Sequence, residues 1–77
     1  MNATFKVQNV NIEGKRAYVR ASVVKPCNFV VSSGSILGGI RLLPEVMEPE
    51  RGVFLFRLEH PADRFRLKIG DTVNLGT

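Results

Sequence analysis

The sequence of 77 residues has no tryptophan, one cysteine and one histidine. A single cysteine, Cys27, excludes an internal disulfide, and no cysteines and histidines cluster at metal-ligand spacing. We therefore expect no metal and no cofactor. The sequence also lacks an apolar run of the roughly 20 residues that a membrane-spanning helix needs, and it lacks the charged and apolar regions of a cleaved signal peptide. These absences predict a soluble, cytoplasmic protein with no membrane partner.

Residues suited to catalysis are equally scarce. The histidine, His60, precedes Pro61 in a predicted turn, and Cys27 follows Pro26 in another. A nucleophilic pair of Cys27 and His60 would require the two to meet in space, and no pair of carboxylates brackets a predicted cleft. Each residue by itself is typical of an ordinary connection. We therefore predict that the protein is not an enzyme.

Apolar residues are abundant, and they alternate with polar ones. They make up 44% of the sequence, which is enough for the one core of a single domain. An alternation of period two, clearest in residues 17–23, is typical of a strand with one buried face. We predict an all-β fold, a small antiparallel β-barrel of five to six strands over residues 1–77. The predicted inward-facing core consists of Phe5, Val7, Val19, Ala21, Phe54, Phe56, Leu58, Phe65, Leu67, Ile69, Val73 and Leu75.

Turn residues divide this pattern into strands. The expected strands, by residue number, are 5–12, 17–23, 29–31, 40–43, 53–58 and 64–69, joined as an antiparallel meander, with Gly70 and Asp71 turning the chain toward Val73 and Leu75. The alternation changes phase near Asn9, which predicts a β-bulge. Pro26 ends the second strand.

The middle of the chain is the least regular part. Ile36, Ile40 and Leu43 have helical spacing, but the glycine pair at 38 and 39 would cost a helix about 2 kcal/mol relative to alanines. We therefore favour a bend that leads into a strand. Two prolines and three glutamates in residues 44–52 predict an exposed acidic loop.

The net charge of +4 is unevenly distributed along the chain. Residues 1–25 hold five cations against one acid, whereas residues 26–50 hold one cation against three acids. If the terminal strands lie together, their cations form a basic side that steers an anionic partner toward the protein. The alternative is that the basic balance only maintains solubility.

The most basic segment is 64–69, where cations alternate with apolar residues. A strand would place Arg64, Arg66 and Lys68 on one face about 6.8 Å apart, a spacing that can follow a phosphate backbone. Arg57 from the neighbouring strand would extend this surface, and Tyr18 would offer a ring on which a base stacks. These residues predict a site for RNA or single-stranded DNA. An ordinary charged face that protects a sheet edge from aggregation is the alternative.

A second set of residues resembles the motifs of the PilZ domain family. Arg16 and Arg20 have the spacing of the family's arginines, and the run from Ser33 through Ser35 to Gly38 looks like its second motif, with serine at position 33 where the family has Asp or Asn. The resemblance implies a six-stranded barrel in which these five residues bind cyclic di-GMP. Arginine offers planar bidentate donors to phosphate and guanine edges, and glycine permits close backbone approach.

The whole chain also looks like the second-domain β-barrel of translation elongation factors. The similar segments are 5–7, 12–15 leading into Val19, and 69–73, where a Gly-Asp pair precedes the closing strand. That resemblance implies a surface for protein and RNA contacts. No Gly-Lys-Ser/Thr phosphate-binding loop occurs, so the chain is not itself a GTPase.

A third class of function is assembly with other proteins. Small β-domains commonly act by docking or strand addition, and the apolar pair Val46 and Met47 in the acidic segment would anchor a partner. The alternative is that this segment folds back over one end of the barrel. The sequence leaves the oligomeric state open.

Overall fold

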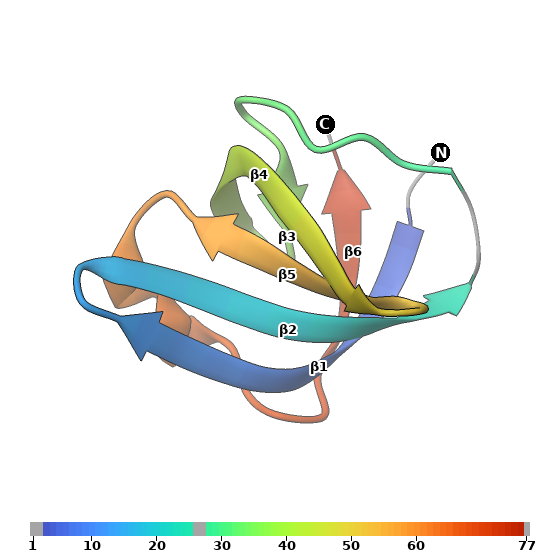
Figure 1. The fold of residues 1–77 in the computed structure, drawn as a ribbon, viewed down its shortest axis with the longest axis horizontal. Helices are drawn as coiled ribbons and strands as arrows, with labels where there is room; N and C mark the ends of the chain where they lie inside the picture. The colour runs from blue at the N-terminus through green and yellow to red at the C-terminus, as the bar shows by residue number, and fades with distance from the viewer. Residues whose placement is uncertain (1–2, 26–27, 77) are drawn as a thin grey trace.

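Six strands and one short helix make up the structure, a computed structural model that describes residues 3–25 and 28–76. The elements are β1 (Ala3–Glu13), β2 (Arg16–Lys25), β3 (Ile36–Leu37), β4 (Ile40–Glu50), β5 (Val53–Leu58), the 3₁₀ helix η1 (Pro61–Arg66) and β6 (Thr72–Gly76). The strands close into a barrel in the order β1-β2-β5-β4-β3-β6, and all neighbours are antiparallel (Figure 1). The predicted all-β barrel is confirmed. The predicted meander is wrong, because β2 pairs with β5 and β6 lies between β1 and β3.

The first hairpin forms as its sequence predicts. The chain turns between β1 and β2 at Gly14, whose φ of +61° suits glycine. The register of this pair shifts between Val7 and Asn9, which confirms the predicted bulge. β2 ends at Lys25, one residue before Pro26; Pro26 and Cys27 lie outside the described residues.

Most of the predicted core is buried, and an aromatic cluster lies at its centre. The Phe5 ring contacts the rings of Phe29 and Phe56 edge to face, with centroids 5.2 and 5.1 Å apart. Phe54 is half-buried against the same core. The predicted strand at 29–31 is wrong: the segment is irregular, and it carries the Phe29 ring onto this cluster. Residues that the prediction missed are also buried: Ala3, Ala17, Leu37, Ile40, Leu42 and Val53.

The glycine pair produces the predicted bend. Gly38 and Gly39 have φ values of +59° and +85°, and they turn β3 into β4. A Cβ at Gly38 would lie 2.7 Å from Cγ1 of Val73, so this turn packs closely against β6. Residues 36–43 are therefore two strands joined by a turn and not a helix.

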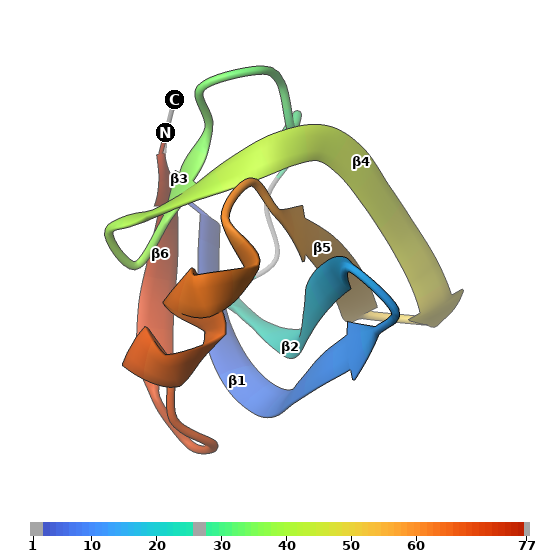
Figure 2. The same cartoon turned by 90° about the vertical axis from the view of Figure 1, so that its left-hand side faces the viewer.

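β4 is longer than predicted. The expected acidic loop at 44–52 is wrong, because β4 continues to Glu50 and only the turn at 51–52 is loop. The pairing of β4 with β5 shifts between Leu42 and Val46 and again between Met47 and Glu50. One proline lies in each irregular stretch, where a missing N–H breaks no regular ladder. Figure 2 shows the resulting wide arch of β4 over the barrel.

The predicted strand at 64–69 is also wrong, and the reason is topological. β5 and β6 are not neighbours, so the chain must cross the end of the barrel between them. Both edges of β6 are already paired, with β1 and with β3. An extended segment would find no free edge there, and η1 lies across the barrel end instead (Figure 2). Leu67 is buried, whereas Phe65 and Ile69 are 74% and 72% exposed and do not belong to the core.

Candidate nucleic-acid interface

Short-range hydrogen bonds shape the basic segment before β6. The N–H of Asp63 donates to the carbonyl oxygen of His60 at 2.9 Å and closes the first turn of η1. Pro61 stands at the start of η1, where a missing N–H costs no intrahelical bond. Past the helix, the Asp71 carboxylate accepts the N–H of Lys68 at 3.0 Å and turns the chain into β6. The predicted cations therefore lie on a helical turn and the loop after it.

Phe65 is exposed, although the sequence pattern predicted that it belongs to the core. Its parity in an assumed strand pointed inward, but in η1 the ring lies on the surface. The guanidinium carbon of Arg64 lies 4.1 Å from the ring centroid, a cation–π contact. Nη1 of Arg64 also donates to the carbonyl oxygen of Pro61 at 2.9 Å, which fixes this cation beside the ring. The exposed aromatic ring is thus held with a cation against it.

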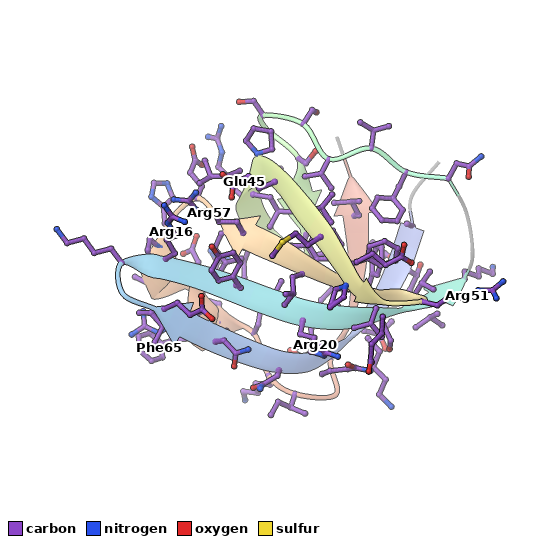
Figure 3. The ribbon with its side chains drawn as sticks, in the orientation of Figure 1. Arg16, Arg20, Glu45, Arg51, Arg57 and Phe65 are labelled. Carbon is purple, nitrogen blue, oxygen red and sulfur yellow. The ribbon has the colours of Figure 1, made fainter. Side chains whose placement is uncertain are left out.

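The other cations here differ in how strongly acids neutralise them. Arg66 lies 3.7 Å from the Asp63 carboxylate, an exposed pair of small energetic value. Among the described residues, no salt bridge engages Arg64 or Lys68. We call Arg64, Phe65, Arg66 and Lys68 the η1 patch. Figure 3 shows Phe65 and Arg51 at opposite ends of the barrel.

The other two residues of the predicted nucleic-acid site lie on a different surface. Tyr18 on β2 and Arg57 on β5 are cross-strand neighbours on the outside of the barrel. Nη1 of Arg57 donates to the Glu45 carboxylate at 2.9 Å (Figure 3). This ion pair offsets the charge that a phosphate would need. The structure brings Tyr18 and Arg57 together but does not join them to the basic segment on one strand face.

The residues of the PilZ-like pattern are distributed around the barrel. Arg16 and Arg20 lie on β2, whereas Ser35 and Gly38 flank β3, which is on the opposite side of the strand order. Arg20 is held by Glu50 at 3.0 Å. Ser33 is exposed in the loop before β3.

Ser35 and Gly38 have clear structural roles. Ser35 is fully buried, and its hydroxyl oxygen accepts the N–H of Ser32 at 2.9 Å. This bond shapes the loop that leads into β3. Gly38 provides the close approach to β6. These local roles account for both residue types without a ligand.

Other kinds of site find little support in the described residues. Within residues 3–25 and 28–76, no three His, Cys, Asp or Glu side chains are grouped to hold a metal ion. His60 is exposed and lies 3.6 Å from the Glu59 carboxylate, and its suggested partner Cys27 is outside the described residues. No helix in the described part of the chain is long and apolar enough to cross a membrane.

Comparisons with known proteins found no family model, no curated protein and no solved structure that matches this chain.

Proposed function

We propose that this protein is a non-catalytic binding module that holds single-stranded nucleic acid, RNA or DNA, on the η1 patch. The observation that carries the proposal is the exposed ring of Phe65 among three cations. Proteins that bind single strands combine aromatic side chains, on which bases stack, with cations that follow the phosphates. The η1 patch supplies both within five consecutive residues, 64–68.

The geometry at Phe65 favours stacking. The ring is 74% exposed, so it offers surface to a base without rearrangement of the core. Arg64 lies against the ring, and the guanidinium N–H groups that do not bond to Pro61 are donors for a phosphate. A charged solvated surface accounts for the three cations alone, but the ring with a guanidinium against it adds the contact that a base needs.

Further cations lie at the same end of the barrel as the η1 patch. Besides the η1 patch, Arg41 lies at the start of β4, two residues after Gly39, and a Cβ at Gly39 would lie 3.9 Å from Nη2 of Arg66. The side chain of Arg66 therefore reaches toward the β3–β4 turn. Arg41 is paired with Glu59 at 3.0 Å and contributes less. A strand that stacks on Phe65 would meet Arg64 against the ring and Arg66 toward the β3–β4 turn.

The direct test is an amide chemical-shift titration of the protein with a short mixed-sequence single-stranded RNA. We expect shifts confined to residues 64–68 that fade as salt is added. Phe65→Ala should weaken binding by roughly 5- to 150-fold, the value of one stacked base. Val30→Ala is the matched control, because Val30 is also 74% exposed but lies in the loop before β3.

Three results would count against the proposal. An affinity that Phe65→Ala leaves unchanged would show that no base stacks on the ring. Shifts spread evenly over the whole barrel would indicate non-specific attraction to a +4 chain. Shifts at residues 16–20 and 33–38 with cyclic di-GMP, and none with RNA, would favour the dinucleotide function instead.

A further inference from the structure

A second surface of the barrel combines exposed apolar side chains with charges that are already paired. It is an open groove of about 540 Å³ across β2, β5 and β4. Tyr18, Leu55 and Met47 line it, and the same three line a smaller hollow on the adjoining side. Met47 is 58% and Val46 40% exposed. We call the groove and its charged rim the β4 face.

The strand register explains why this surface exists. Met47 lies opposite Leu55 on β5, and Leu55 lies opposite Arg20 on β2. Side chains one residue away along β5, such as Phe56, point into the core. The irregular pairing on both sides of Met47 bends β4 outward, so the side chains between β4 and β2 are left uncovered.

Ion pairs border the apolar centre at both ends. Arg57 contacts Glu45 at 2.9 Å at one end, and Arg20 contacts Glu50 at 3.0 Å at the other. Met47 lies between Glu45 and Glu50 along β4. An apolar centre with a polar rim that includes Tyr, Met and Arg is the composition typical of protein interfaces.

The charge balance identifies which partner fits. The β4 face carries three cations and three acids: Arg16, Arg20 and Arg57, and Glu13, Glu45 and Glu50. Its formal charge is therefore zero, and the +4 of the chain lies entirely on other residues. A polyanion gains nothing from such a surface. A second copy of this basic chain can approach here without the repulsion that it meets elsewhere.

We propose that the β4 face is the interface of a two-fold symmetric homodimer. In a two-fold arrangement both copies contribute the same surface to the interface, so the apolar centre of one copy packs against the apolar centre of the other. The Arg57–Glu45 and Arg20–Glu50 pairs are each neutral within one copy, so these pairs at the rim add no net repulsion between two copies. The η1 patch lies outside this interface, so dimerisation and nucleic-acid binding are independent.

The test is sedimentation equilibrium of the full chain over a range of concentrations, with Met47→Arg and Met47→Glu as variants. We expect a reversible dimer in the wild type and a dissociation constant at least roughly tenfold higher in both variants, because a charge at the apolar centre cannot be paired there. Since the side chain of Met47 is largely exposed, neither change disturbs the core. Val30→Arg is the matched control, and it should leave the dimer unchanged.

Each alternative has a distinct outcome. A monomer at all concentrations, or a dimer that both Met47 variants leave intact, overturns the proposal; the first result would leave the β4 face to a different protein or to solvent. Amide spectra of the variants verify that the barrel remains folded. Two cross-tests separate this proposal from the nucleic-acid function. RNA binding is measured with the Met47 variants, and dimerisation is measured with Phe65→Ala, so the failure of one proposal does not imply the failure of the other.

Discussion

Removal of the cations in the η1 patch should flatten the salt dependence of RNA binding. Each phosphate that a protein neutralises on a single strand contributes about 0.7 to the slope of log K against log salt. Arg64, Arg66 and Lys68 lie outside the core and are available for three such contacts. Alanine at all three positions should therefore reduce the slope by about 2. Between about 50 and 200 mM salt, the wild type should lose roughly 20-fold more affinity than this variant.

The assay is fluorescence anisotropy of a labelled single-stranded RNA across a salt series. The matched control is alanine at Lys6, Lys25 and Arg51, which lowers the net charge by the same amount. Those three residues are exposed and lie on β1, on β2 and in the β4–β5 turn. Equal slopes for the two triple variants would show that general charge, and not the η1 patch, drives binding. A slope unchanged from the wild type would exclude the η1 patch altogether.

Three further predictions concern the stability of the barrel. Gly38→Ala should lower the free energy of unfolding in urea by about 2–4 kcal/mol, because a left-handed φ is combined there with a steric clash against Val73. At Gly34 a Cβ would meet open space, so Gly34→Ala should cost only the backbone strain of about 1 kcal/mol. Equal losses in the two variants would contradict the close packing at Gly38. Phe56→Ala should lower the free energy of unfolding by about 3–5 kcal/mol because Phe56 is buried, and Phe65→Ala should lower it by under about 0.5 kcal/mol because Phe65 is exposed. If thermal unfolding showed that Phe65→Ala is the more destabilised variant, the assigned burial would be contradicted. Ser35→Ala should cost about 0.5–1.5 kcal/mol, the net value of the hydrogen bond that the N–H of the exposed Ser32 loses; amide exchange at residue 32 should increase, and unchanged exchange would mean that the bond does not form.

The comparison of 17–23 with 64–69 shows what alternation can predict. Both segments alternate strictly, but only the first is a strand. Residues 17–23 follow a two-residue turn at Gly14 and Lys15, so their partner β1 is adjacent in the chain and pairs without competition. Residues 64–69 have no such partner, because β1 and β3 occupy both edges of β6. Alternation predicts a strand only where an edge is free to receive it.

The prediction of the candidate site also depended on the strand assumed at 64–69. The cations at 64, 66 and 68 were identifiable from sequence, because each is basic in any conformation. Phe65 was not, since its assignment to the core followed from the assumed strand. The pairing of Arg57 with Glu45 and of Arg20 with Glu50 joins residues from different strands, and no spacing along the chain indicates it.

One small β-barrel with a basic balance was predictable from the residues alone, and so were the hairpin turn at Gly14, the bulge near Asn9 and the bend at the glycine pair. These features depend on local periodicity and on the backbone freedom of single residues. The strand order, the extension of β4 through two prolines and the helical form of η1 instead depend on contacts between distant parts of the chain. Closing a barrel fixes which edges remain free, and this long-range constraint overrides local pattern wherever the two disagree.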